Sequence, residues 1–155
     1  MPLRFPYLVR PSPVPVYPLG GALTRSYPIF PVDVTGMLSH KLGEGLLDSG
    51  SDDTILPANL APVLGVDLHN APEGEAKGMG GLPLRYRYAT VRLHVTDLRD
   101  TCEWDAIVGF VNLPLRRLVL GRTGFLQYFD TKLLGLGAVV ELEPNASFPG
   151  QHTIH

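Results

Sequence analysis

Glycine and proline interrupt the apolar runs of this chain so often that few long elements can form. Its 155 residues include 17 glycines and 15 prolines. Short apolar runs bounded by such turn residues are typical of β-strands. They occur at 29–34, 45–47, 104–111, 118–120, 131–134 and 138–142. Only 54–65 and 123–129 favour short helices. The pattern predicts an all-β, closed-barrel-like fold with one or two short helices.

The longest predicted strand, residues 84–95, changes its apolar face partway along. Leu84 and Tyr88 share one parity, whereas Val91 falls on the other. Because side chains alternate between the two faces of a strand, an unbroken strand would put these residues on opposite sides. The switch predicts a bulge or a sharp twist near Tyr88.

Proline also sets the N-terminal segment apart. Eight of the fifteen prolines lie within residues 1–31, and proline at this density removes backbone donors and favours an extended polyproline conformation. We therefore expect an arm at 1–26 that lies extended along the domain or is partly disordered. Residues 27–144 are predicted to form the folded domain. Residues 145–155 show no pattern, and we expect them to form a loose tail.

Composition and charge describe one soluble globular domain. The chain is 45% hydrophobic with a net charge of -2, which indicates an adequate core and no basic stripe for nucleic acid. No apolar run reaches the ~18 residues of a membrane span. The N-terminal sequence Met-Pro-Leu-Arg-Phe-Pro lacks the apolar core of a signal peptide. We expect a cytoplasmic protein with neither a nucleic-acid nor a membrane partner.

The triplet Asp48-Ser49-Gly50 is the strongest candidate for chemistry. It follows directly on two leucines, so a buried strand delivers a carboxylate onto a tight turn. Asp48 can accept or donate a proton, and Gly50 lets backbone N–H groups approach the carboxylate without a Cβ in the way. Ser49 adds a short hydroxyl that can lock the turn. The same three residue types also form ordinary turns, so the triplet alone does not identify a site.

Two later segments complete a more specific pattern. Residues 118–122, Leu-Val-Leu-Gly-Arg, form an apolar strand that ends in glycine just before the helix predicted at 123–129. Residues 78–81, Gly-Met-Gly-Gly, lie between the triplet and this strand and predict a mobile hairpin tip. In this order the three elements resemble the retropepsin-like family of single-domain aspartic proteases. The resemblance covers residues 27–144.

The resemblance implies an aspartic endopeptidase that acts on peptide or protein substrates as a homodimer and needs no cofactor. Such hydrolysis needs two carboxylates that share one proton, one acting as a base toward water and the other as an acid toward the carbonyl. The chain has one copy of the motif, so a second Asp48 must come from another subunit across a twofold axis. Two carboxylates so close titrate as a unit, and we expect activity on the acidic side of neutrality.

The resemblance also implies a role for each site residue. The catalytic residues are Asp48, Ser49 and Gly50, with the Ser49 hydroxyl bracing the two active loops across the dimer axis. The substrate-binding residues are Asp53, Gly78, Met79, Gly80 and Gly81, the last four as a flap over the peptide. The structural residues are Asp52, Gly121 and Arg122, with an ion pair between Asp52 and Arg122.

The ends of the chain and the flap depart from the retroviral pattern. Retroviral dimers are sealed by interleaved N- and C-terminal strands, whereas this chain adds an arm before its core and a tail after it. The dimer can therefore close differently. Pro83 follows the flap tip and removes a ladder hydrogen bond there. The arm region also contains aromatic-proline bonds, a type that retroviral members cut, which suggests self-processing. These bonds are Phe5-Pro6, Tyr17-Pro18, Tyr27-Pro28 and Phe30-Pro31.

Other functions compete with proteolysis. The main alternative is a catalytically silent retropepsin-fold module that dimerises or binds peptides, since fold does not imply function. The five histidines show no paired spacing of metal ligands. Ser49 lacks the Gly-x-Ser-x-Gly setting of a serine hydrolase. Cys102, the one cysteine, excludes an internal disulfide and fits a buried apolar position better than a nucleophile.

Overall fold

The structure is a computed structural model, and it describes residues 2–77 and 80–155. The strands are β1 (Leu3–Pro6), β2 (Leu8–Val16), β3 (Ala22–Tyr27), β4 (Ile29–Thr35), β5 (His40–Leu47), β6 (Ile55–Pro57), β7 (Glu73–Lys77), β8 (Pro83–Thr96), β9 (Asp100–Val111), β10 (Leu118–Leu120), β11 (Phe129–Leu134), β12 (Val139–Pro144) and β13 (Gln151–Ile154). The helical segments are η1 (Tyr17–Leu19), α1 (Leu60–Leu64) and η2 (Leu126–Tyr128). The all-β fold class is confirmed.

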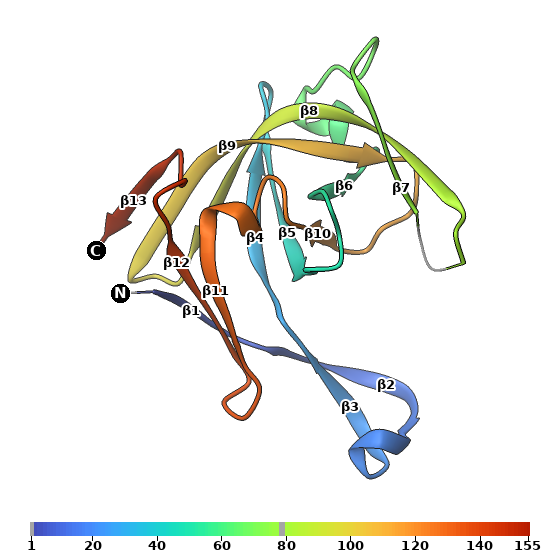
Figure 1. Cartoon of the computed structure of the whole chain (residues 1–155), viewed down its shortest axis with the longest axis vertical. Coiled ribbons are helices and arrows are strands. Elements are labelled where there is room, and N and C mark those ends of the chain that lie inside the picture. The colour runs from blue at the N-terminus through green and yellow to red at the C-terminus, as the bar shows by residue number, and fades with distance from the viewer. Residues whose placement is uncertain (1, 78–79) are drawn as a thin grey trace.

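Six strands close into a barrel (Figure 1). Their order is β9-β6-β10-β5-β4-β8, and pairing between β8 and β9 completes the ring. Strands β13 and β7 extend the sheet beyond β9 and β8, while β1, β12 and β11 form a separate three-stranded sheet. The prediction of a closed barrel is therefore confirmed.

An aromatic cluster fills the barrel end nearest the last strands. Trp104 packs edge-on against Phe125, Phe129 and Phe148, with ring centroids 5.4, 5.3 and 5.6 Å away. Its indole N–H donates a hydrogen bond to the Gly124 carbonyl at 3.0 Å, so the one polar atom of the ring is satisfied. Each such aromatic pair adds about 0.5–1.5 kcal/mol beyond its burial. The cluster fixes the segment after β10 against the barrel.

The N-terminal segment is ordered and forms strands, so the expectation of partial disorder is wrong for the described residues. Strand β1 pairs antiparallel with β12 and buries Leu3 and Phe5 in the core. Strands β2 and β3 form a hairpin whose register runs from Leu8 opposite Tyr27. Its turn is possible because Gly20 and Gly21 adopt positive φ angles of 68° and 83°. The expectation that the arm lies extended along the domain fits β1, whereas the β2–β3 hairpin extends away from the barrel (Figure 1).

The expected loose tail at 145–155 is also corrected. Residues 151–154 form β13, which pairs antiparallel with β9, and the His155 N–H donates to the Arg99 carbonyl at 2.7 Å. All four residues of β13 are exposed. Main-chain hydrogen bonds rather than apolar burial hold this strand, which is why no hydrophobic pattern marked it.

Two of the expected elements differ in type or extent. The segment predicted as a helix from residue 54 begins as strand β6, because Ile55 pairs with both Gly109 and Val119 inside the barrel. The helix itself is limited to α1. The helix expected at 123–129 shortens to η2, since Gly124 has a φ of 86° that a right-handed helix cannot contain.

The predicted bulge near Tyr88 is absent, because β8 and β9 keep an unbroken register from Tyr86 opposite Val111 to Thr96 opposite Thr101. The two halves of β8 instead bury opposite faces. Tyr86 belongs to a small apolar cluster outside the main core, whereas Val91 faces the main core. Among the described residues, no helix combines the length and apolar character required to cross a membrane.

Candidate active site

Strands β5 and β10 bring two of the three sequence elements together. They pair in parallel, with Gly45, Leu46 and Leu47 opposite Leu118, Val119 and Leu120. Both strands therefore end at the same place, where the Asp48 N–H donates to the Leu120 carbonyl at 3.0 Å. Parallel pairing explains how the Asp48 turn and Gly121, which are far apart in sequence, become neighbours.

The Asp48 turn holds its own carboxylate in place. The Gly50 N–H donates to Asp48 Oδ1 at 2.9 Å, and the Ser51 N–H donates to the Asp48 carbonyl at 3.1 Å. A Cβ on Gly50 would lie 3.2 Å from Asp48 Oδ1, so glycine keeps this approach open. Asp48 is partly exposed and Ser49 is exposed. The turn thus presents one oriented carboxylate toward solvent.

A second loop, beginning at Gly121, braces this turn. The Arg122 N–H donates to the Ser51 carbonyl at 2.9 Å, and the Thr123 N–H donates to the Asp52 carbonyl at 2.8 Å. The two loops approach so closely that a Cβ on Gly121 would lie 2.9 Å from the Ser51 oxygen and 2.6 Å from the Asp53 carbonyl carbon. Only glycine fits at this crossing.

Thr54 is a residue of this site that sequence reasoning missed. Its side chain is completely buried, with 0% exposure, between the two loops. The hydroxyl donates to the Thr123 carbonyl at 2.8 Å and accepts from the Gly121 N–H at 3.3 Å. A hydroxyl residue shortly after the Asp-Ser-Gly triplet, at the start of an apolar strand, was the available signal. Thr54 is a positioning residue that joins the loops behind Asp48.

Asp52 and Arg122 form an ion pair, in agreement with the contact implied by the resemblance. Their side chains are 70% and 60% exposed. Water screens an ion pair of this kind, and such pairs contribute only about 0–1 kcal/mol. The backbone hydrogen bonds between the loops, rather than this pair, supply most of the bracing.

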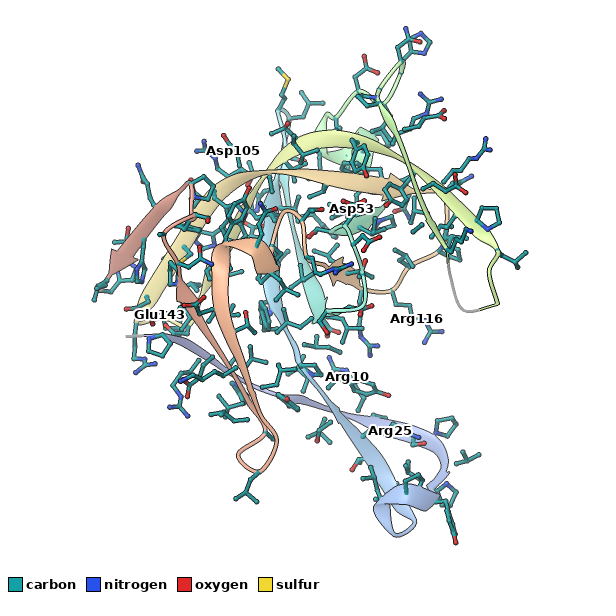
Figure 2. The ribbon with its side chains drawn as sticks, in the orientation of Figure 1. Arg10, Arg25, Asp53, Asp105, Arg116 and Glu143 are labelled. Atoms are coloured by element: carbon teal, nitrogen blue, oxygen red, sulfur yellow. The ribbon has the colours of Figure 1, made fainter. Side chains whose placement is uncertain are left out.

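The Asp53 carboxylate turns toward strand β8 rather than standing free in the cleft. Tyr86 and Tyr88 both donate their hydroxyl protons to Asp53 Oδ2, the latter at 2.7 Å, and Thr123 donates to Oδ1. Figure 2 shows Asp53 lying below this strand. We call these residues the Asp53 clasp. The clasp ties the loop after Asp48 to β8, and the sequence did not mark the two tyrosines as site residues because the contact is long-range.

The clasp shifts the titration of its members. Burial by itself raises the pKa of Asp53, but the hydrogen bonds from Thr123, Tyr86 and Tyr88 outweigh it, so the pKa lies below its ordinary value of 3.8. Burial and the hydrogen bond to Asp53 raise the pKa of Tyr86 well above its ordinary value. Across the neutral range Asp53 is therefore ionised and Tyr86 keeps its proton.

Replacing both clasp tyrosines, as Tyr86→Phe/Tyr88→Phe, is expected to lower the free energy of unfolding by about 1–2 kcal/mol at neutral pH. Because the folded pKa of Asp53 lies below 3.8, this stabilisation is present above that pH and is lost as the pH falls through the folded pKa. Urea unfolding at neutral pH and at about pH 3 measures the difference, which should narrow in acid.

The matched control is Tyr7→Phe, which removes a hydroxyl from a packed tyrosine remote from Asp53. We expect it to change stability by no more than about 0.5 kcal/mol at either pH. If the difference in the free energy of unfolding between wild type and the double variant is the same at both pH values, the hydroxyls do not act through the Asp53 charge.

A cleft of about 390 Å³ opens beside Asp48. Apolar side chains from four parts of the chain line it, namely Ile55, Leu84, Val111 and Val119. Strand β8 enters the cleft wall from the β7–β8 hairpin, where Lys77 lies opposite Pro83. The site therefore combines a carboxylate with an apolar surface suited to uncharged side chains.

The predicted flap maps onto this hairpin. Gly78 and Met79 lie outside the described residues. Gly80 and Gly81 are exposed and have positive φ angles of 93° and 76°, as a tight hairpin end requires. Pro83 is the first residue of β8, a position that tolerates a missing backbone donor.

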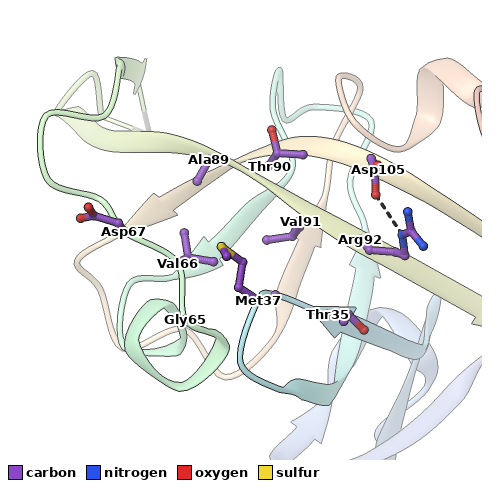
Figure 3. A pocket seen from close by; sticks show the side chains of 11 residues that line it. Thr35, Met37, Gly65, Val66, Asp67, Ala89, Thr90, Val91, Arg92 and Asp105 are labelled. Carbon is purple, nitrogen blue, oxygen red and sulfur yellow. Dashed lines mark hydrogen bonds and ion pairs between the residues drawn. The ribbon is translucent and has the colours of Figure 1, made fainter.

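A separate hollow of about 480 Å³ lies where the β4–β5 turn meets β8 (Figure 3). Met37, Val66 and Val91 line it, and at its rim Arg92 pairs with Asp105 at 3.0 Å. It contains no histidine or cysteine. Asp105 is paired with Arg92, and the other carboxylate of the hollow, Asp67, is exposed and accepts the backbone N–H of His69 at 2.8 Å.

Other reactive groups do not gather in the part of the chain that the structure describes. It contains no group of three or more His, Cys, Asp or Glu residues able to hold a metal ion. Cys102 is buried, and burial raises the pKa of its thiol to about 12. A thiol with such a pKa stays protonated and unreactive. In comparisons with known proteins, no family model and no curated protein matches the chain.

Proposed function

We propose that this chain is a retropepsin-like aspartic endopeptidase that acts as a homodimer. The observation that carries the proposal is the junction of β5 and β10, where the Asp48 carboxylate is oriented by the Gly50 N–H at 2.9 Å beside an apolar cleft. A carboxylate oriented by a backbone donor next to a peptide-sized apolar surface suits acid–base hydrolysis of an amide bond.

The reaction needs a second carboxylate, and symmetry supplies it. One ionised carboxylate takes a proton from water as the water oxygen attacks the scissile carbonyl carbon. The other, protonated carboxyl gives its proton to the carbonyl oxygen, which produces a tetrahedral diol. Collapse of the diol breaks the C–N bond as a proton passes to the departing amine. In this scheme Asp48 and the partner subunit's Asp48 exchange these two roles.

The exposure of Asp48 supports this arrangement. The turn at Asp48 and Ser49 reaches the surface of the single chain, where a second copy can approach it. A twofold axis beside the turn would bring two identical carboxylates together without any further motif in the sequence. The two short loops would then close one site from both sides.

The test is digestion of a peptide library, scanned from about pH 4 to pH 7, where a carboxyl pair should act. Because the cleft is lined by apolar side chains, we expect cleavage between two apolar residues and little cleavage when either is replaced by a charged one. We also expect the rate to fall toward neutral pH. A folded dimer that yields no products at any of these pH values would contradict the proposal.

The alternative is a peptide-binding module that keeps the cleft without cutting. The Asp53 clasp favours the binding module in one respect. Asp53 already accepts hydrogen bonds from Tyr86, Tyr88 and Thr123, which compete with any bond to a substrate. The assignment of Asp53 to the substrate backbone therefore stays a prediction. Peptide retention without cleavage would select the binding module.

Self-processing, if the chain cuts itself, has one accessible bond among the four aromatic-proline candidates. Phe5 and Phe30 are 5% and 1% exposed within paired strands. Tyr27 is half-buried at the end of β3. Tyr17 is 93% exposed at the hairpin tip. The bond between Tyr17 and Pro18 is therefore the one we propose as the self-processing site.

A further inference from the structure

The β2–β3 hairpin is a projection without a core of its own. It forms a two-stranded sheet that pairs with no third strand, and it extends away from the barrel (Figure 1). An isolated two-stranded hairpin is at best marginally stable in water. Such an element gains stability when another surface covers it.

The side chains of this hairpin are those of an interface. Its large apolar residues stand in solvent, with exposures of 56% for Val9, 64% for Val14, 93% for Tyr17, 52% for Leu19 and 65% for Leu23. The hairpin carries only two charged residues, Arg10 and Arg25, which lie opposite each other (Figure 2). Apolar residues gathered on one element, with few charges between them, mark a protein-binding surface.

The root of the hairpin is fixed next to the catalytic turn. Arg10 pairs with Glu44 on β5, and Arg117 approaches the same carboxylate at 3.6 Å. The Arg117 guanidinium also lies 5.2 Å from the centroid of the Tyr27 ring. One residue before Asp48, the Leu47 N–H donates to the Pro28 carbonyl at 3.1 Å. The hairpin therefore leaves the barrel at the start of β4, beside the strand that presents Asp48.

Among the strands near the two ends of the chain, β12 is closed to a partner, whereas β1, β11 and β13 each keep one outer edge in the described sheets. Strand β12 has β1 on one edge and β11 on the other, both from its own chain. It has no free edge onto which a second copy could add a strand. The Asp48 turn alone is too small for a stable interface, which needs about 800 Å² from each partner. Some other surface must supply the area.

We propose that the β2–β3 hairpin is a dimerisation arm that packs on a second copy of this chain and so sets the partner's Asp48 beside its own. The choice of a second copy rests on the proposed function, because a site with one carboxylate is incomplete without it. A hairpin rooted beside the axis reaches over the partner, and by symmetry the partner's hairpin reaches back.

A receiving surface exists on the same side of the barrel. The β11–β12 turn projects in the same general direction as the hairpin in Figure 1. It exposes three leucines, Leu133, Leu134 and Leu136, the last of them fully. In a symmetric pair, the partner's hairpin would cover these leucines. The same contact would bury the exposed apolar side chains of the partner's hairpin. One contact of this kind buries both exposed groups.

The test compares wild type with Val14→Ser/Leu19→Ser/Leu23→Ser in the full chain. Sedimentation velocity over a range of concentrations gives the dimer dissociation constant. Loss of three apolar contacts should raise that constant about a hundredfold. The control is Met37→Ser/Leu98→Ser, which removes two still more exposed apolar side chains outside the hairpin, at 92% and 86%, and should leave the dissociation constant unchanged.

Circular dichroism establishes that the barrel of the triple variant is folded. A photoreactive residue in place of Tyr17 gives a second, independent readout, since it should cross-link one copy to another. Dimers that persist unweakened in the triple variant would overturn the inference. So would a wild-type monomer at all concentrations, including one that binds anionic vesicles instead.

Dimerisation and proteolysis fail separately in this design. If wild type dimerises through the hairpin but cuts no peptide, the result supports the dimerisation arm and contradicts the proposed protease activity. If wild type cuts peptides and the triple variant cuts them equally well at low concentration with an unchanged dissociation constant, the protease stands and the arm falls. Recovery of the triple variant's activity at high concentration would support both.

Discussion

Asp48→Asn is expected to lower the rate of peptide cleavage by about a thousandfold or more, while the free energy of unfolding changes little. The amide matches the carboxylate in shape, and its oxygen can still accept the Gly50 N–H that now reaches Asp48 Oδ1. It can neither take a proton from water nor supply one to the carbonyl at the required stage. Peptide digestion and urea unfolding of the same preparation measure the two effects.

The control is Asp130→Asn, which neutralises an exposed carboxylate on β11 and should cut peptides at the wild-type rate. Mixing provides a second check. Excess Asp48→Asn chains should capture wild-type chains in mixed dimers that hold one working carboxylate, so activity should fall faster than dilution alone explains. Undiminished cleavage by the variant would point to a different catalytic group or a contaminating protease.

Gly121→Ala is expected to destabilise the protein by about 3 kcal/mol and to remove activity as well. The added methyl would press on the backbone of the loop after Asp48, 2.6 Å from the Asp53 carbonyl carbon and 2.9 Å from the Ser51 oxygen. Backbone atoms cannot rotate away as a side chain can. The two loops must separate, and the hydrogen bond from the Gly121 N–H to Thr54 must lengthen or break.

The matched change is Gly137→Ala in the β11–β12 turn, where an added Cβ meets nothing within 4 Å. It should alter the free energy of unfolding by no more than about 0.5 kcal/mol. Urea denaturation of both variants at neutral pH gives the comparison. Equal stability of the two variants would mean that the loops part at little cost, and that the bracing of Asp48 is weaker than the packing indicates.

Local patterns predicted the barrel, because its strands are short apolar runs that end in turns, and the resemblance implied the contact between Asp52 and Arg122 that the structure shows. The Asp53 clasp was not predictable in this way. Its contacts join Asp53 to Tyr86 and Tyr88, more than thirty residues away, and no local periodicity encodes such a hydrogen bond. Thr54 also bonds residues far along the chain, Gly121 and Thr123, although its position just after the Asp-Ser-Gly triplet was a local signal.

The sequence did not predict the strands at the two ends of the chain, because hydrophobic alternation is missing at one end and proline masks it at the other. Strand β13 is exposed at every position, so main-chain pairing alone defines it and the sequence carries no apolar alternation. In the N-terminal segment, the many prolines favour an extended chain, whereas Gly20 and Gly21 adopt the positive φ angles that allow the chain to reverse. Along β8 the change of parity predicted a bulge or a sharp twist. The unbroken register with β9 excludes the bulge, and the strand buries different faces along its length.

Strand β8 has a mechanical consequence. The first residues of β8 belong to the hairpin beside the cleft. Further along, Tyr86 and Tyr88 donate hydrogen bonds to Asp53. Val91 and Val95 are buried in the core. The hydrogen bonds of the Asp53 clasp hold β8 in place at Tyr86 and Tyr88. A displacement of the described residues of β8 ahead of Tyr86 would therefore leave the barrel wall and Asp48 in place.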